Sequence, residues 1–391
     1  MSASFDDIIA SDGRNLSTQL RALREQLFPS AGQKELRKFS SGEAARLIRV
    51  TDGYLRQLSI AGEGPTPETG PGGRRSYTLT QINELRSMLD LAKPGKRFVK
   101  HRRGSEKLQV IAVVNFKGGS GKTTTAAHLA QFLTLQGYRV LAVDLDPQAS
   151  LTALHGFQPE FDVGPRESLY GAICYSDDRR PLSEIIRHTY FDGLDIVPAN
   201  IELMEFEHET PEALSKKRAG PLFFARVAEA LGTVQDAYDV VVMDCPPQLG
   251  YLTLSALCSA TGLIITAHPQ MLDIMSMCQF LIMTSDLLSV VRKAGGRLDY
   301  DFIRYLVTRY EPSDGPQTKI VAFMRSMFQD RVLTHPMLKS TAISDAGLSK
   351  QTLYEVGREF FTRSTYDRAV EALDAVNVEI ESLVRTSWGR A

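Results

Sequence analysis

The sequence predicts an α/β protein with a doubly wound, mostly parallel sheet, preceded by a small helical domain. Continuous apolar runs, the first of them LQVIAVVNF at residues 108–116, have the composition of strands that are covered on both faces. Helical segments separate these runs, and a Gly-rich turn follows the first one. Before residue 93 the chain instead carries short amphipathic helices and Gly/Pro-rich turns. Its 391 residues, 43% of them hydrophobic, suffice for two or three domains.

Composition and charge narrow the class of protein. Lys and Arg number 45 against 46 Asp and Glu, so any affinity for a polyanion must come from local clusters of charge. The start has no basic segment followed by an apolar one, and we find no apolar run of the ~18 residues that a membrane-spanning helix needs. We therefore expect a cytoplasmic protein without membrane contact. The cysteines lack the spacing of zinc ligands or of a disulfide framework, and we expect them to be reduced and mostly buried: Cys174, Cys245, Cys258 and Cys278.

Residues 1–35 form the first predicted unit. Residues 15–28 are predicted to be an amphipathic helix, because leucines recur on one face and charges lie elsewhere. Too little sequence follows to cover this face locally. The helix therefore packs on its own domain or pairs with a second copy as a dimer contact, and the sequence leaves both open. The leucines on this face are Leu16, Leu20, Leu23 and Leu27.

Residues 36–92 form the second predicted unit, which begins with two short helices. Ser40 and Glu43 have the spacing of a capping box, which starts the first helix. Thr51 is a good N-cap for the second helix, in which Leu55 and Leu58 point inward. This pattern is typical of a helix-turn-helix.

A Gly/Pro-rich stretch leads from these helices to a basic segment, GRRSYTLTQINELRSML, which predicts a hairpin and then a helix opening at Thr80. Together the segments resemble a winged helix-turn-helix of the MerR-like kind, which binds DNA. Two helices and a turn also occur in small helical domains without such a role, and the Arg pair in the wing favours DNA. The predicted DNA contacts are Arg46, Tyr54, Arg56, Gln57, Arg74 and Arg75.

Residues 93–107 form a basic linker. It is interpreted either as a solvated hinge or, beside a DNA-binding unit, as a source of salt-dependent phosphate contacts without base specificity. Against a single Glu106 it carries Lys93, Lys96, Arg97, Lys100, Arg102, Arg103 and Lys107.

A Gly-rich loop after the first strand opens the third predicted unit, residues 108–391, and is the strongest signal in the chain. It reads KGGSGKTT, and the strict Walker pattern is not met because Phe116 stands where its first glycine would be. Glycines let successive N–H groups surround a polyphosphate, and the helix that begins near Lys122 points its positive end at the same anion. Lys122 is expected to reach the β- and γ-phosphates of ATP, and the Thr123 hydroxyl to bind Mg²⁺. The loop consists of Lys117, Gly118, Gly119, Ser120, Gly121, Lys122, Thr123 and Thr124.

This loop resembles the deviant Walker A box of the ParA/MinD family of P-loop ATPases, in which a second, signature lysine precedes the glycines. Here that residue is Lys117. The resemblance implies a P-loop NTPase fold and a homodimer that sandwiches two ATP molecules, with each signature lysine reaching the phosphates held by the partner. A cation supplied in trans stabilises the transition state only after the dimer has formed, as an arginine finger does.

Three aspartates follow predicted strands and complete the expected site. Asp144 and Asp146 end the strand in YRVLAVDLDPQ, and their alternation places both carboxylates on one face. The resemblance implies that Asp146 positions or activates the attacking water and that Asp144 reaches the metal through water. Asp244 ends the run AYDVVVMD, which resembles a Walker B strand, and is expected in the metal shell. Any one of these residues alone has the simpler reading of a helix cap.

Further apolar runs near residues 197, 265 and 307 are expected to complete an open sheet. By the resemblance, the adenine lies near Pro269 and Gln270 or near Thr308 and Arg309.

An N-terminal helix-turn-helix before the ATPase is similar to the larger plasmid members of the family, the ParA/RepA type. The resemblance implies a plasmid partition ATPase whose ATP-bound dimer binds nonspecific DNA on the nucleoid. It further implies that a centromere-bound ParB-type partner stimulates hydrolysis and that the N-terminal domain represses its own operon. The candidates for nonspecific DNA contact are Lys339 and Lys350, with Arg292, Lys293 and Arg297, although each one alone is more simply a solvated charge.

Three alternatives remain. A MinD-like membrane ATPase requires a basic amphipathic C-terminal helix, whereas the tail YDRAVEALDAVNVEIESLVRTSWGRA carries more acid than base. A nitrogenase-like iron protein requires paired cysteines, and Cys245 has no counterpart in a matching context. A transcriptional repressor that is regulated by ATP and has no partition role shares every motif.

Overall fold

The N-terminal helix is longer than predicted. The computed structural model describes residues 4–27, 34–93, 95–217, 220–296 and 298–390, and the chain divides into units of residues 1–35 and 36–391, which are described separately. Helix α1 spans Phe5–Leu27 instead of starting at residue 15, because Asp6 and Asp7 stabilise its first turn and the Ser4 hydroxyl accepts a hydrogen bond from the Asp7 N–H. Of the predicted apolar face, Leu16 and Leu20 are exposed, while the side chains of Leu23 and Leu27 lie outside the described set.

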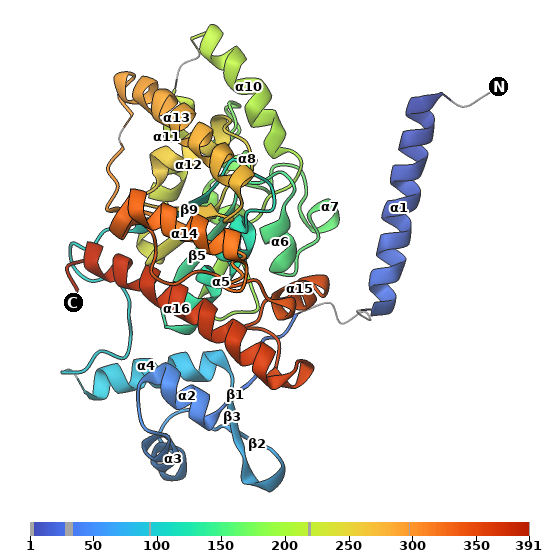
Figure 1. Ribbon diagram of the computed structural model, residues 1–391. Helices are drawn as coiled ribbons and strands as arrows, with labels where there is room; N and C mark the ends of the chain where they lie inside the picture. The colour runs from blue at the N-terminus through green and yellow to red at the C-terminus, as the bar shows by residue number, and fades with distance from the viewer. Residues whose placement is uncertain (1–3, 28–33, 94, 218–219, 297, 391) are drawn as a thin grey trace. The chain divides into compact units, whose positions relative to one another are not determined.

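Residues 36–92, here called the winged domain, contain the predicted helices and hairpin (Figure 1). The capping box of Ser40 and Glu43 and the N-cap at Thr51 are confirmed. The helix predicted to open at Thr80 begins at Leu79, because Thr78 and Gln81 form a second capping box. The sheet order is β1-β3-β2, with both pairings antiparallel. The elements are β1 (Phe39–Ser40), α2 (Ser41–Ile48), α3 (Asp52–Ala61), β2 (Glu68–Thr69), η1 (Pro71–Gly73), β3 (Arg75–Tyr77) and α4 (Leu79–Ala92).

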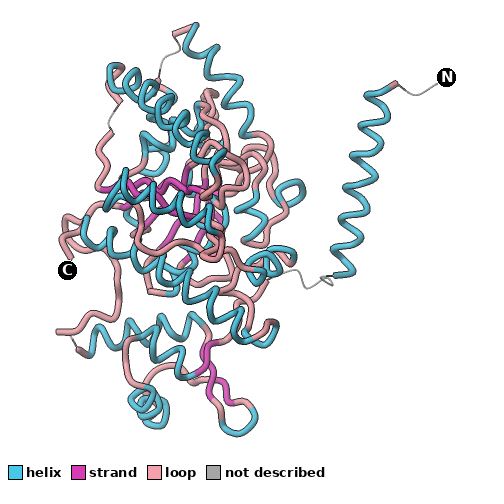
Figure 2. The backbone as a smooth tube through the Cα atoms, viewed as in Figure 1, coloured by secondary structure: helices cyan, strands magenta, loops and turns pink. Residues whose placement is uncertain are grey.

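The rest of the chain, which we call the ATPase domain after the family that its Gly-rich loop resembles, is built on the predicted doubly wound sheet (Figures 1 and 2). Its order is β10-β9-β4-β8-β5-β7-β6, and every pairing is parallel except that of the short edge strand β6. The strands are β4 (Gln109–Val114), β5 (Val140–Asp144), β6 (Arg187–His188), β7 (Leu194–Val197), β8 (Val240–Asp244), β9 (Gly262–Ala267) and β10 (Phe302–Val307).

Helices cover both faces of this sheet, because its central strands direct apolar side chains to both faces. Ile111 and Val113 of β4 pack into the core on one face, whereas Ala112 and Val114 pack into the core on the other. The first face is covered by α5 (Lys122–Leu135), α15 (Thr341–Leu348) and α16 (Arg363–Ser387), and the second by α8 (Tyr170–Ile173), α10 (Leu203–Ser215), α11 (Phe223–Gly232), α12 (Tyr251–Ser259) and α13 (Met271–Lys293). The other elements are α6 (Ser150–Leu154), α7 (Pro159–Asp162), α9 (Leu182–Ile185), η2 (Gln235–Ala237), α14 (Gly315–Phe328), η3 (Gln329–Arg331) and η4 (Arg358–Phe360).

The basic linker is only partly the solvated hinge or phosphate-binding segment that was predicted. Lys100 is 9% exposed and forms an ion pair of 2.6 Å with Glu381 of α16. Arg102 donates its main-chain N–H to Asp239 and its Nε to the Tyr238 carbonyl. These cations are held inside the protein, because buried carboxylates and carbonyls of the ATPase domain compensate them.

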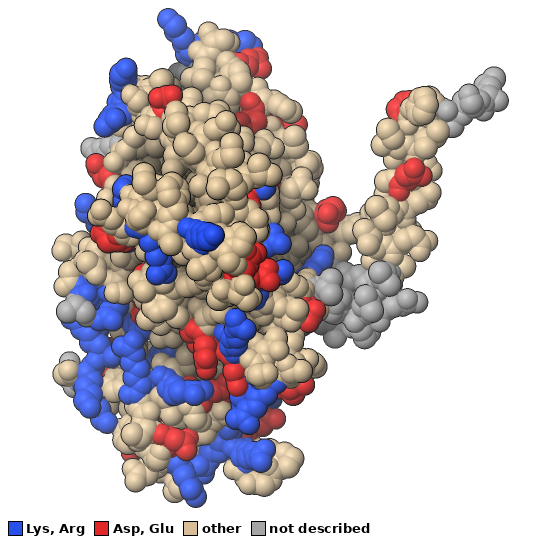
Figure 3. Space-filling view, viewed as in Figure 1, with Lys and Arg blue, Asp and Glu red and all other residues tan. Residues whose placement is uncertain are grey.

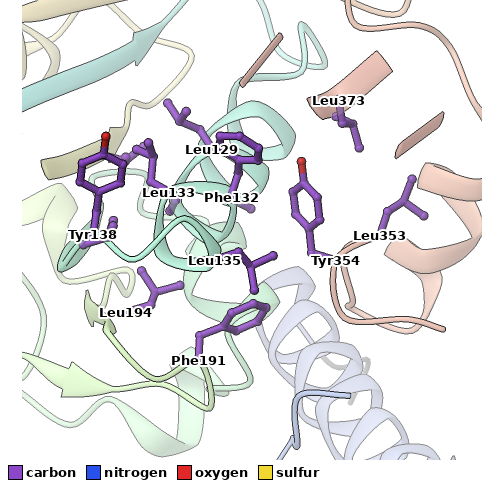
Figure 4. Packing of buried hydrophobic residues seen from close by; sticks show 14 of the residues in the cluster. Leu129, Phe132, Leu133, Leu135, Tyr138, Phe191, Leu194, Leu353, Tyr354 and Leu373 are labelled. Carbon is purple, nitrogen blue, oxygen red and sulfur yellow. The ribbon is translucent and has the colours of Figure 1, made fainter. Parts of the chain in front are cut away.

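The core of the winged domain is continuous with that of the ATPase domain. Leu85 and Leu89 of α4 belong to the same buried cluster as Phe132 and Leu135 of α5. Figure 4 shows Phe132 and Leu135 among the packed side chains of this cluster, with Tyr354 beside them. The Gly-rich loop therefore lies at the N-terminal end of α5, and the winged domain packs at its C-terminal end.

The prediction that no segment is long and apolar enough to span a membrane is wrong for helix α13. By length and composition alone, this helix could cross a membrane. An 18-residue window has a mean hydropathy of 1.6, and 22% of that window is buried. Methionines and scattered aliphatic residues raise its mean hydropathy, and polar residues interrupt them before a long apolar run can form. The helix packs Met277, Phe280 and Val291 against the second face of the sheet. The solvent exposure of the cysteines varies more than predicted. Cys174 and Cys245 are buried, Cys258 is half-buried, and Cys278 on α13 is exposed.

Candidate functional site

The Gly-rich loop joins β4 to α5 at the carboxyl edge of the sheet. Lys117, Gly118 and Gly119 are exposed at its tip. Gly121 has a φ of +86°, a left-handed conformation that glycine adopts without strain, and α5 begins at the next residue, Lys122, as predicted. The exposed loop and the start of this helix together form an anion-binding end.

Neighbouring strands hold the loop in place. Asn115 accepts a hydrogen bond of 3.0 Å from the Lys117 N–H and donates one to the Thr266 carbonyl of β9. The Thr266 hydroxyl donates a bond of 3.0 Å to the hydroxyl of Ser120, which is 3% exposed. The loop is thus shaped before any ligand binds, which lowers the entropy cost of binding.

Two of the residues predicted near the adenine, Thr308 and Arg309, contact the loop itself. Thr308 is fully buried and donates its hydroxyl to the Ser120 carbonyl at 2.7 Å. Arg309 donates to the Gly119 carbonyl at 3.2 Å. Pro269 is buried between β9 and α13. The adenine contact of all three residues stays a prediction, and Thr308 and Arg309 brace the loop.

Two lysines occupy different environments. Lys122 is 5% exposed and donates to the Lys117 carbonyl at 3.1 Å. Burial lowers the pKa of Lys122, and the charge of Asp244 opposes that change. Lys117 is half exposed, and its ammonium group forms an ion pair with Asp273 of α13. Asp273 also pairs with His268 Nδ1 at 2.9 Å.

Sequence reasoning missed Asp273 and His268. The only signal was their position just after a predicted strand, close to Pro269. Their pairing with Lys117 depends on the contact between α13 and the loop, which has no local signature. Lys117 is thus held by a carboxylate of its own chain.

The three predicted aspartates lie at the ends of β5 and β8. Asp144 and Asp244 are register neighbours and are fully buried. Burial raises the pKa of Asp144 to about 7, and burial followed by the charge of Asp144 raises that of Asp244. The Asp144 carboxylate already accepts bonds from the Thr152 hydroxyl and the Asp146 N–H, at 2.7 and 3.1 Å. Asp146 is half-buried, at the edge of the site.

These residues fit a magnesium ion that is bound together with a nucleotide. Both Asp244 oxygens are buried and accept no hydrogen bond from the residues that the structure describes. Within the same described residues, no group of three or more His, Cys, Asp and Glu side chains is placed to hold a metal ion. Mg²⁺ uses few carboxylates and completes its shell with phosphate and water, so the predicted ligands Thr123 and Asp244 fit such an ion. The contact of Asp144 with the metal through water stays a prediction.

The ion pair of Lys117 gives a testable prediction. In Asp273→Asn the lysine loses its partner in the same chain, and we expect basal ATP turnover to rise about fivefold, because a partly exposed pair contributes about 1 kcal/mol. Steady-state turnover across a range of protein concentrations measures this effect. Asp286→Asn, which removes an exposed carboxylate from the same helix, is the control. Unchanged or lower turnover in Asp273→Asn contradicts the prediction.

The predicted DNA contacts fall into several environments. Arg56 and Gln57 are exposed on α3. Tyr54 is half-buried, and its hydroxyl accepts a bond of 2.8 Å from Lys93, whose ammonium group lies 4.0 Å from the ring centroid. Lys339 forms an ion pair of 2.8 Å with Glu311. Lys350, Arg292 and Lys293 are exposed, and Arg297 lies outside the described residues.

Arg46, Arg74 and Arg75 line a groove between the winged domain and α16. The groove has a volume of ≈ 1160 Å³, and its other wall carries Glu371 and Asp374. Figure 3 shows basic and acidic side chains close together in this lower part of the molecule. DNA that reaches the basic wall therefore meets carboxylates nearby.

The sheet order and the loop define a P-loop nucleotide-binding protein. A family model described as an AAA domain matches residues 108–293. The chain is 56% identical over 390 residues to "Putative replication protein A" of Sinorhizobium fredii, covering 99% of this chain and 95% of that protein. It is 31% identical over 332 residues to Protein SopA of Escherichia coli K12, and the match covers 83% of this chain and 82% of SopA. The chain belongs to the ParA/MinD family of P-loop ATPases.

Solved structures agree with this fold. Cobyrinic acid a,c-diamide synthase from Mycobacterium smegmatis, with bound ADP and magnesium, is 28% identical with a TM-score of 0.55, covering 72% of this chain and 97% of that one. A structure named Partition Protein has a TM-score of 0.64 at 19% identity and covers 94% of this chain and 98% of its own. At that identity the second likeness concerns the fold alone.

Proposed function

We propose that this protein is a plasmid partition ATPase that hydrolyses ATP with Mg²⁺ as a dimer. It binds nonspecific DNA in the ATP-bound state, a centromere-bound ParB-type partner stimulates its hydrolysis, and the winged domain represses its own operon. The observation that carries the proposal is a phosphate loop with two lysines, one buried in its own site and one exposed at the tip. The membership of the chain in the ParA/MinD family and its similarity to Protein SopA support this proposal.

The surface beside the exposed lysine supports a dimer. Met271, Leu272 and Met275 on α13 are 62%, 72% and 59% exposed. They lie next to Asp273, the ion-pair partner of Lys117. An apolar patch of this kind marks a protein interface more often than a solvated surface. A second copy placed here would bring its Lys117 close to the first nucleotide.

Each residue then has a separate task. Lys122 and the N–H groups at the start of α5 hold the β- and γ-phosphates, and Asp146 orients the attacking water. Lys117 of the second copy stabilises the charge that develops as the γ-phosphate leaves. Mg²⁺, held by Thr123 and Asp244, would neutralise phosphate charge when bound with ATP.

A plasmid retention experiment tests the proposal. A replicon that carries the gene of this chain should be kept over many generations, whereas the Asp146→Ala version should be lost at the rate of a replicon without the gene. Repression of a reporter behind the gene's own promoter is the control, because operator binding does not require the attacking water. Retention of the Asp146→Ala replicon would contradict a partition role and favour the alternative, an ATP-regulated repressor.

The wing gives a separate prediction. Arg74→Ala with Arg75→Ala should weaken operator binding about tenfold and lower the slope of log K against log salt by about 2, because each phosphate contact contributes about 1. Filter binding or anisotropy at several salt concentrations measures both. Turnover should stay unchanged, and Arg179→Ala with Arg180→Ala is a matched Arg pair in the ATPase domain. If the slope of log K against log salt is the same in the double variant as in the wild type, the wing does not contact DNA.

A further inference from the structure

Arg86 of α4 is a buried cation where the winged domain meets the ATPase domain. It is 1% exposed, and burial lowers the pKa of its guanidinium group to about 10. The nearby charge that acts on it is that of a second cation, Arg49, which lowers the pKa further. Among the residues that the structure describes, Arg86 forms no ion pair, the arrangement in which a charge is usually found in the interior.

The guanidinium group joins the C-terminal ends of two helices. It donates to the carbonyl of Leu47, next to the last residue of α2, at 2.8 Å. It also donates to the carbonyl of Leu135, the last residue of α5, at 2.5 Å. The last carbonyls of a helix have no partner within the helix and carry the negative end of its dipole. One side chain therefore binds a helix end in each domain.

The surroundings of Arg86 are shaped to hold it. Asn83 accepts a bond of 2.7 Å from the guanidinium group and donates one of 2.7 Å to Asp192 of the ATPase domain. Gly137 follows α5 with a φ of +92°, and a Cβ atom at this position would lie 3.1 Å from Arg86 Nη1. A side chain at residue 137 would thus press on the guanidinium group as well as strain the backbone.

Helix α5 connects this joint to the nucleotide loop. The helix has 14 residues, from Lys122 in the loop to Leu135 at Arg86, which makes it about 20 Å long. Its side chains are buried over most of its length, so a displacement at the phosphate end moves the other end with it. Without the guanidinium group, the carbonyls of Leu47 and Leu135 would lose this donor, so Arg86 is the side chain that ties the two helix ends together.

We propose that Arg86 transmits the nucleotide state of the loop to the winged domain, so that nucleotide binding and operator binding are coupled through α5. The inference rests on the proposed function, because it requires a loop that binds nucleotide and a winged domain that binds DNA. Coupling is reciprocal, so bound DNA changes nucleotide affinity by the same factor. Arg86 is a positioning residue and touches neither ligand.

The full-length chain and the DNA fragment upstream of its own gene provide the test. The Kd for the fragment is measured without nucleotide, with ADP and Mg²⁺, and with a non-hydrolysable ATP analogue and Mg²⁺. We expect the wild-type Kd to differ about fivefold or more between nucleotide states. In Arg86→Met, the ratio of the Kd values for the fragment in two nucleotide states should fall to within about twofold of one. The Kd for nucleotide in the absence of DNA should stay within about threefold of that of the wild type.

Arg226→Met is the matched control. Arg226 is 4% exposed and donates to the carbonyls of Ile173 and Cys174 at 3.1 and 2.7 Å, on the opposite face of the sheet. Its removal also deletes a buried guanidinium group but should leave the ratio unchanged. If Arg86→Met unfolds below the assay temperature, Asn83→Ala, which loosens the same joint, should lower the ratio in its place.

The outcomes separate the two proposals. A wild-type ratio near one, or a ratio that Arg86→Met and Asn83→Ala leave unchanged, overturns the role of Arg86. Equal losses in Arg86→Met and Arg226→Met also overturn it, because the effect would then follow from destabilisation alone. A wild-type chain that binds no fragment, or no nucleotide, overturns the proposed function instead.

Discussion

ATP turnover falls about 10³-fold in Lys117→Ala while ATP affinity stays close to that of the wild type, if this lysine acts on the nucleotide of the second copy. The size of the loss is that expected when a cation supplied in trans no longer stabilises the leaving phosphate. Lys117 is half exposed and is held by Asp273, so its removal leaves the buried part of the site intact. Turnover is measured by phosphate release, and affinity by calorimetry with a non-hydrolysable analogue.

Mixing two inactive variants tests the trans arrangement directly. A dimer of one Lys117→Ala chain and one Asp146→Ala chain has one complete site, in which the first chain supplies Asp146 and the second supplies Lys117. With free exchange of subunits, half of the dimers are mixed and each has one active site of two, so the mixture should recover about a quarter of wild-type turnover. A mixture that stays inactive contradicts action in trans.

ATP affinity falls more than about a hundredfold in Lys122→Ala. This lysine is 5% exposed and is held against the loop by the Lys117 carbonyl. Loss of one partner of a buried charge pair costs about 3 kcal/mol, and the Asp244 carboxylate, left without an opposing cation, adds repulsion toward the phosphates. Titration calorimetry with a non-hydrolysable ATP analogue and Mg²⁺ measures the loss.

Lys117→Ala is the natural control for that experiment, because the two lysines lie in one loop and differ in burial. A circular dichroism melting curve shows whether Lys122→Ala keeps its fold. Similar losses of affinity in both variants would contradict the separate tasks assigned to the two lysines.

The sequence was sufficient for the sheet and the phosphate loop, because both depend on local patterns. A strand covered on both faces must be apolar over most of its length, and β4, β5, β8 and β9 each have one polar residue: Gln109, Asp144, Asp244 and Thr266. Glycine spacing and the helix start at Lys122 are equally local. Capping explains the small errors, since Thr78 starts α4 one residue before the predicted opening and Asp6 extends α1.

The remaining features depend on contacts between distant segments. Asp273 meets Lys117 only because α13 packs beside the loop, and Lys100 is buried only because α16 supplies Glu381. Arg86 looks like an ordinary charge on an amphipathic helix until α5 ends against it. Buried cations of this kind have no signal in a single sequence, since solvated and compensated charges use the same residue types.

The shared core beneath α4 has a consequence for how such proteins are assembled from parts. Phe132 and Leu135 belong to a buried cluster that includes Leu85 and Leu89 of the winged domain. Deleting residues 1–92 would expose an apolar patch on the surface of the ATPase domain, and such a patch would promote aggregation. If the N-terminal domain is gained or lost during evolution, the apolar residues at the C-terminal end of α5 must therefore change at the same time.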